Sequence, residues 1–250
     1  SGVVQVGFLG VLALIGLFMF LFCFATVRER IKPAVPSNDA LKQDLRDVWK
    51  NDQWVRILLL TFCNVCPGFI RMAATMYYVV WVMEKSTHFA TLFISLGVIG
   101  MMFGSALAKP LTDRYCKLKV FFWTNIVLAI FSCGFYWVNP HATTLVLVLY
   151  FLLNILHQLP SPLHWSLMAD VDDYGEWKTG KRSTGISFSG NLFFLKVGLA
   201  VAGAMVGFLL SAYGYDAGAA RQSDSAVGGI ILLFTIIPGI GYLITAGVVR

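Results

Sequence analysis

Seven long apolar segments constrain the fold of this chain more than any other feature of its sequence. Each is long enough to cross the roughly 30 Å hydrocarbon core of a bilayer, for which a helix needs about 20 residues. The segments are apolar on every side, without the alternation of membrane β-strands. We therefore expect an all-α polytopic membrane protein with spans at Val4–Thr26, Trp54–Met83, Phe89–Ala108, Val120–Val138, Thr143–Met168, Ile186–Ala212 and Val227–Val249.

The composition excludes an ordinary soluble domain. Hydrophobic residues make up 58% of the 250 residues and charged residues 13%, about half the charged share of a soluble protein. The number of cysteines, five, is odd, and most lie inside apolar segments. Cys63 and Cys66 form a CxxC pair without a second pair or a histidine cluster, which favours buried thiols over metal or redox chemistry.

The basic residues are distributed unevenly between the two sides that alternating loops define. One side carries Lys85 and Arg221 only, and Arg56, Arg71 and Lys196 lie within the spans. By the positive-inside rule, the other side is cytoplasmic, with loops 28–53, 109–119 and 170–185. The net charge of +6 therefore reflects topology and not nucleic-acid binding. The 14 cytoplasmic basic residues are Arg28, Arg30, Lys32, Lys42, Arg46, Lys50, Lys109, Arg114, Lys117, Lys119, Lys178, Lys181, Arg182 and Arg250.

The spans and the longest polar stretch divide the chain into three parts. Residues 1–27 form one helix, 28–53 a cytoplasmic linker, and 54–250 a six-helix bundle. Within the linker, Asn38–Asp52 has the pattern of an amphipathic helix, which could lie on the membrane surface or pack on neighbouring loops. The chain begins at Ser1 inside an apolar stretch, so we expect it to be a piece of a longer protein.

A charged segment follows the fifth span, in the sequence WSLMADVDDYGEWKTGKR. Asp170, Asp173 and Glu176 are spaced i, i+3, i+6, so a helix would align them on one side, and Arg182 follows closely. Two interpretations are equally open from the residues alone. The segment could be a solvated helix end with weak local pairs, or a cytoplasmic gate that pairs in one conformation only.

The segment MADVDDYGEWKTGKR closely resembles the signature of the glycoside–pentoside–hexuronide:cation symporters, the melibiose permease family of the major facilitator superfamily. The stretches IRMAATMYYVVWVM, GSALAKPLTDRYCKLK and SFSGNLFFLKVGLAVAGAMVG resemble the family's helix seven, its loop between helices eight and nine, and helix eleven. Of the loop motif, Asp113, Arg114 and Lys117 match, whereas Lys109 and Cys116 stand where glycines are usual. The resemblance is strongest to enterobacterial members thought to carry xylosides and related glycosides.

The resemblance implies an architecture and an activity. The chain would be helices six to twelve of twelve, with about five further helices before Ser1 in a remaining half of the same protein. It would be an inner-membrane symporter that moves a sugar or glycoside together with Na⁺ or H⁺, and no cofactor is implied. The family's cation carboxylates lie on helices two and four, and Leu192 replaces the helix-eleven threonine of the melibiose permease. We therefore expect the cation site mainly outside this chain.

Polar residues inside the spans are the candidates for binding. The fifth span carries Asn154, His157 and Gln158 just before Pro160-Ser161-Pro162, which should break the helix. Such amides and imidazoles often serve only to join helices. Lys196 lies ten residues into its span, roughly 15 Å deep, where a charge is costly. Our candidates for lining a sugar cavity are Lys196, Arg71, Asn64, His157, Gln158 and Trp165, and those for the cytoplasmic gate are Asp170, Asp173, Glu176, Arg182, Asp113 and Arg114.

The acidic residues leave the two deep cations without an obvious partner. All 13 fall in loops or near span ends, far from Arg71 and Lys196. Carboxylates on other helices of the whole protein, or an anionic substrate, could supply the opposite charge. The rival interpretation is a membrane-embedded enzyme of the prenyltransferase type, in which Asp170, Asp173 and Glu176 hold Mg²⁺ and pyrophosphate. That site would need a second acidic cluster of matching spacing, which the sequence does not offer.

Overall fold

The computed structural model describes residues 2–28, 46–180 and 182–250. The chain divides into two compact units, residues 1–41 and 42–250. The first contains the apolar helix α1 (Gly2–Thr26). In the second, regular structure is helical throughout the described residues. The all-α prediction is therefore confirmed, with seven helices or helix pairs long and apolar enough to cross a membrane.

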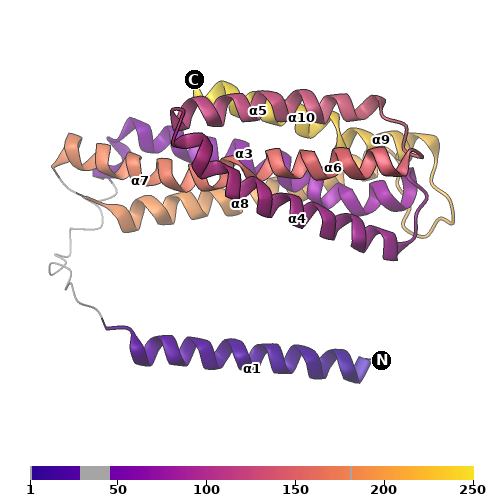
Figure 1. Cartoon of the computed structure of the whole chain (residues 1–250), viewed down its shortest axis with the longest axis horizontal. Coiled ribbons are helices and arrows are strands. Elements are labelled where there is room, and N and C mark those ends of the chain that lie inside the picture. The colour runs from indigo at the N-terminus through magenta and orange to yellow at the C-terminus, as the bar shows by residue number, and fades with distance from the viewer. Residues whose placement is uncertain (1, 29–45, 181) are drawn as a thin grey trace. The chain divides into compact units, whose positions relative to one another are not determined.

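The second unit contains six spans, several of them built from two helical segments (Figure 1). The pairs α3·α8, α5·α10, α4·α6 and α3·α10 share the largest interfaces. The segments are α3 (Asp52–Tyr77) with the π-helical turn η1 (Tyr78–Val82), α4 (Thr87–Thr112), α5 (Lys117–Gly134) with the 3₁₀ turn η2 (Phe135–Trp137), α6 (Thr143–Gln158), α7 (Pro160–Thr179), α8 (Thr184–Ala212), α9 (Asp224–Phe234) and α10 (Ile236–Val249).

Local sequence signals set several helix ends. The side chains of Asn51, Ser86 and Ser223 accept hydrogen bonds from the free backbone N–H groups at the starts of α3, α4 and α9, as N-cap residues do. Gly180 ends α7 in the left-handed conformation, with φ of 72°, which glycine adopts without a steric penalty. At the starts of α3, α4 and α9 the predicted and observed spans agree to within two or three residues.

The cytoplasmic ends extend further than the apolar pattern predicted. Residues 170–179 belong to α7, so the prediction of a loop over 170–185 is wrong for its first ten positions. A helix needs no apolar side chains once it leaves the bilayer, and charges spaced three apart are compatible with it. Residues 109–112 likewise continue α4.

The prolines in the fifth span coincide with the predicted interruption, because α6 ends at Gln158 and α7 begins at Pro160, but the interruption is confined to one residue. Leu159, between α6 and α7, keeps right-handed helical dihedrals, and Thr143–Thr179 forms one membrane-length span. Pro160 and Pro162 occupy the first turn of α7, where a missing N–H is tolerated. The ring nitrogens remove two helical donors but leave the helix running in the same direction through the membrane.

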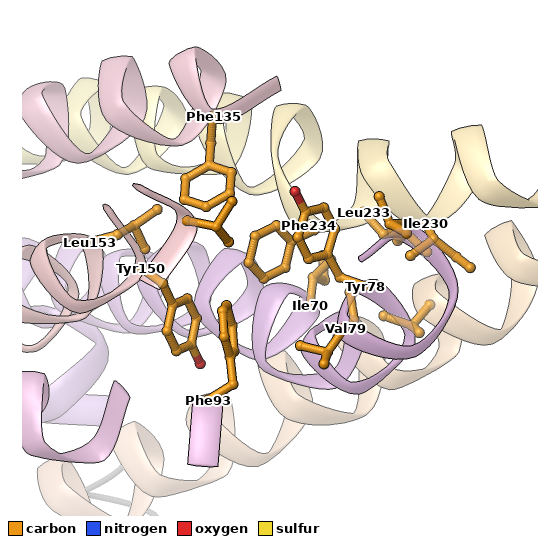
Figure 2. Packing of buried hydrophobic residues seen from close by; sticks show 14 of the residues in the cluster. Ile70, Tyr78, Val79, Phe93, Phe135, Tyr150, Leu153, Ile230, Leu233 and Phe234 are labelled. Carbon is orange, nitrogen blue, oxygen red and sulfur yellow. The ribbon is translucent and has the colours of Figure 1, made fainter. Parts of the chain in front are cut away.

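Two apolar clusters hold the six spans together. The larger one contains stacked aromatic pairs, with ring centroids of Tyr78 and Phe234 4.1 Å apart and those of Phe93 and Tyr150 4.0 Å apart (Figure 2). The second cluster surrounds Trp54 and Phe121 and includes Val48. The predicted linker helix Asn38–Asp52 is described only from residue 46, and 46–49 are helical. The rest of the prediction lies outside the described residues.

Candidate functional site

A polar-lined cavity of about 220 Å³ lies among α3, α4, α6, α7 and α8. Its polar side chains come from two stripes at helical spacing, one on α3 and one running from α6 into α7. Such spacing places them on one face of each helix. The polar lining residues are Asn64, Arg71 and Thr75 on α3, with Tyr150, Asn154, His157, Gln158 and Ser161 on the second helix.

Four of the six predicted binding residues meet in this cavity, namely Arg71, Asn64, His157 and Gln158. The other two lie elsewhere in the described structure. Lys196 is exposed on α8, while Leu199, almost one turn later, contacts the cavity. Trp165 is 39% exposed and its ring stacks on Phe188, with centroids 6.3 Å apart.

Arg71 and His157 share one aromatic neighbour, Tyr242 of α10. The guanidinium carbon of Arg71 lies 5.4 Å from the centroid of the Tyr242 ring, within the range of a cation–π interaction. The Tyr242 hydroxyl lies 3.2 Å from Nδ1 of His157. Sequence reasoning missed Tyr242, because nothing in its local sequence links α10 to the other two helices.

A glycine on α3 allows the His157 ring to approach. A Cβ atom added at Gly68 would clash with Cε1 and Nε2 of His157, so any larger residue would displace the ring. Gly68 shares its face of α3 with Asn64, Arg71 and Thr75, at the helical spacing of positions 64, 68, 71 and 75. That spacing could have predicted Thr75 and Gly68 as further lining residues. In the same way, the spacing of positions 150, 154, 157 and 161 could have predicted Tyr150, Asn154 and Ser161.

A second buried polar cluster lies one helical turn to the cytoplasmic side of the cavity. Thr61 of α3 donates a hydrogen bond to Oδ1 of Asn191 of α8, and its hydroxyl lies 3.1 Å from Nε2 of His164 of α7. Nε2 of His164 is also 3.4 Å from Nδ2 of Asn191. These contacts join α3, α7 and α8. The sequence did not predict them.

The predicted gate residues form ion pairs, but in three separate places. Arg182 bridges Asp173 and Glu176, at 3.0 and 3.2 Å. Asp170 pairs with Lys117 of α5 at 2.8 Å. Asp113 pairs with Lys109 of its own helix at 3.1 Å. Arg114 is exposed and has no ion-pair partner within 2–28, 46–180 and 182–250.

Further polar contacts at this end were not predicted. Lys178 of α7 pairs with Asp52 at the start of α3 at 2.6 Å, and the Tyr174 hydroxyl donates to the same carboxylate at 3.2 Å. Asp172 differs from its charged neighbours because it is only 4% exposed, and its Oδ2 has no hydrogen-bond partner in the described structure. Asp172 borders a small space together with Asn51 and Ser187, and the sequence carries no sign of that.

Comparison with known proteins identifies the family behind this arrangement of six spans, cavity and charged cytoplasmic end. Residues 3–249 match the family described as "MFS/sugar transport protein". The chain belongs to the MFS/sugar transport family. This membership excludes the prenyltransferase-type enzyme, because the family consists of transporters.

Individual relatives in the MFS/sugar transport family agree with this assignment. The chain is 45% identical over 240 residues to the "Inner membrane symporter YicJ" of Escherichia coli K12, covering 96% of this chain and 52% of that protein. It is 32% identical over 241 residues to the "Putative glycoside/cation symporter YagG" of the same organism, covering 95% of this chain and 52% of the relative. The chain thus spans about half the length of these curated relatives.

Proposed function

We propose that the whole protein is a secondary active symporter, which moves a sugar or glycoside across the inner membrane together with Na⁺ or H⁺. The observation that carries this proposal is the cavity, where the polar side chains of Arg71, Asn64, His157 and Gln158 converge from α3 and α6. Amide, imidazole and guanidinium groups provide the donors and acceptors that sugar hydroxyls require. The names of YicJ and YagG, a symporter and a glycoside/cation symporter, support the same activity.

The cavity is smaller than a complete binding site. Its volume of about 220 Å³ falls below the roughly 300–1,000 Å³ of typical ligand pockets. We propose that the remaining half of the whole protein closes it, and that the site for the coupling cation lies mainly there. No further cofactor is part of this proposal.

Lys196 and Trp165 complete the proposed site from its exposed side. Lys196 lies near the middle of the span Thr184–Ala212, where an ammonium group facing lipid is costly. Coverage by the other half would place Lys196 in the protein interior, near the solute. Trp165, half-exposed on α7, presents an aromatic face of the type that packs on the apolar side of a sugar ring.

The charged residues at the cytoplasmic end serve as the gate in this proposal. Lys117–Asp170 joins α5 to α7, and Lys178–Asp52 joins α7 to α3. Pairs of this kind hold one conformation, and a change of solute occupancy shifts the population between conformations. Asp173, Glu176 and Arg182 reinforce the end of α7, while Asp113 and Arg114 support it from α4.

The test is uptake of radiolabelled glycosides and pentosides by the full-length protein in proteoliposomes. We expect accumulation of at least one sugar above its external concentration when an inward Na⁺ or H⁺ gradient is imposed, and equilibration only without it. A panel of sugars that is never accumulated under either gradient would contradict the proposal. Empty liposomes under the same gradients are the control.

A further inference from the structure

The guanidinium group of Arg71 is buried, and one of its terminal nitrogens has no hydrogen-bond partner within the described residues. The residue is 3% exposed, and its Nη1 atom is shielded from solvent without a partner. Its head group lies against the Tyr242 ring. Arg71 nevertheless lines the cavity. A side chain that carries five N–H donors in a fixed fork thus lines the cavity with at least the donors of Nη1 unused.

No carboxylate of the described chain can reach this group. The residues that line the cavity include no aspartate and no glutamate. Along α3, the preceding acidic residue is Asp52, which is 71 − 52 = 19 residues away and therefore about 28 Å along the helix. Asp52 is also already paired with Lys178.

The charge of Arg71 has to be balanced, because the side chain cannot lose its proton in a protein. An uncompensated buried charge is strongly unfavourable, and one aromatic ring offsets only part of that cost. A planar fork of donors matches a carboxylate through two parallel hydrogen bonds. The neighbouring side chains of Asn154, His157 and Gln158 can bind hydroxyl groups beside that carboxylate.

We propose that Arg71 is a carboxylate-binding subsite of the cavity. The carboxylate comes either from an acidic sugar, such as a uronic acid, or from a side chain of the remaining half of the protein. This inference rests on the proposed transport function for the meaning of the cavity, and it defines the chemistry of one position in it. The two sources leave different electrostatic potentials in the empty cavity, because only a side-chain carboxylate is present without the solute.

The experiment measures that potential with charged thiol reagents on the full-length protein, in a background without native cysteines. Ser161→Cys places a thiol in the cavity wall, and Met101→Cys provides a second position on α4 if the first variant folds poorly. The readout is the ratio of labelling rates for the anionic ethylsulfonate and the cationic ethyltrimethylammonium methanethiosulfonates. The ratio is compared among the parent, Arg71→Gln, Arg71→Lys, and Arg56→Gln, an exposed arginine of the same helix.

Each outcome has one meaning. If the carboxylate belongs to the solute, the parent prefers the anionic reagent by about tenfold or more, as in a positively charged cleft. Arg71→Gln then abolishes this preference, while Arg71→Lys and Arg56→Gln keep it. If the carboxylate belongs to the protein, the parent shows no preference and Arg71→Gln creates one for the cationic reagent. A ratio unchanged by Arg71→Gln overturns the subsite. Labelling requires no transport, so this result is independent of the uptake test.

Discussion

The guanidinium carbon of Arg71 and the ring of Tyr242 lie 5.4 Å apart, at the contact between α3 and α10. The hydroxyl of the same tyrosine reaches His157 at 3.2 Å. Tyr242 is completely buried, so one side chain positions two of the polar groups that line the cavity. This arrangement allows the roles of the ring and the hydroxyl to be separated by substitution.

Tyr242→Phe should remove the contact with His157 and keep the ring beside Arg71. We expect a loss of about 1 kcal/mol in stability, which is typical of one hydrogen bond, and a moderate decrease in uptake. Tyr242→Ala should cost about 3–5 kcal/mol, as large aromatic truncations do. Thermal unfolding of the purified protein measures both, and Tyr136→Phe, at an exposed tyrosine, is the control. Equal effects of Phe and Ala would assign the whole contribution to the hydroxyl.

Gly68→Ala should displace the His157 ring, because the added methyl group meets Cε1 and Nε2 of that ring. We expect uptake to fall by about tenfold or more, since small misplacements in a site are costly. The double variant Gly68→Ala/His157→Ala should lose little beyond His157→Ala alone. Gly247→Ala is the matched control, because nothing lies within 4 Å of its added Cβ. Additive effects of Gly68→Ala and His157→Ala on uptake would contradict a direct contact between these two residues.

Lys196→Ala or Lys196→Gln should abolish sugar accumulation while the protein remains folded and inserted. The expected cause is the loss of a mid-membrane cation that faces the solute in the whole protein. Accumulation in proteoliposomes and size-exclusion profiles of the purified variants measure the two properties. Lys119→Ala, at an exposed position near the start of α5, is the control. Near-normal accumulation by Lys196→Ala would make Lys196 a packing residue.

Neutralising Asp170, Asp173 and Glu176 together should open the cytoplasmic side. A cysteine at Gln158, in the cavity wall, should then react faster with a membrane-impermeant reagent added from the cytoplasmic face of inside-out vesicles. A shift in population explains the change, because the ion pairs stabilise one conformation only. Unchanged labelling would indicate that these residues form only weak local ion pairs at a solvated helix end. Asp113→Asn, whose partner lies on its own helix, should have a smaller effect.

Asn191→Ala should destabilise the protein by about 1–3 kcal/mol, because it removes a buried acceptor of the Thr61 hydroxyl and a contact of Nε2 of His164. Both residues are less than one-tenth exposed. Ser189→Ala, on an exposed face of the same helix, should change stability by less than about 0.5 kcal/mol. Denaturation midpoints of the two variants in the same detergent provide the comparison. Equal midpoints would show that the hydrogen bonds of Asn191 contribute nothing measurable to stability.

The sequence was sufficient for the spans because their signal is local. Apolar length alone located all seven, whereas it placed the end of the fifth span at Met168, although α7 continues to Thr179. The polar stripe at 64, 68, 71 and 75 was also present in the sequence. Only Asn64 and Arg71 of this stripe were selected, because Gly68 and Thr75 are not unusual inside a membrane span.

Contacts between distant segments could not be predicted in the same way. Tyr242 is separated from His157 by 85 positions and Asn191 from Thr61 by 130, and a single sequence carries no record of such pairs. The burial of Asp172 beside exposed Asp173 depends on which side of α7 faces Asn51 and Ser187. The charge pattern is the same for both residues, so only the packed structure distinguishes them.

The succession of α6 and α7 in one span connects the wall of the cavity with the charged cytoplasmic end. Thr143–Thr179 runs as one span of 37 residues, about 55 Å long at 1.5 Å per residue. Asp173 lies 173 − 158 = 15 residues beyond Gln158, so it is about 23 Å further along the same rod. A tilt of about 10° at the cavity would move Asp173 sideways by about 4 Å, enough to separate an ion pair. If the whole protein is the proposed symporter, small adjustments around a bound solute would thereby become larger displacements of the ion pairs at the cytoplasmic surface.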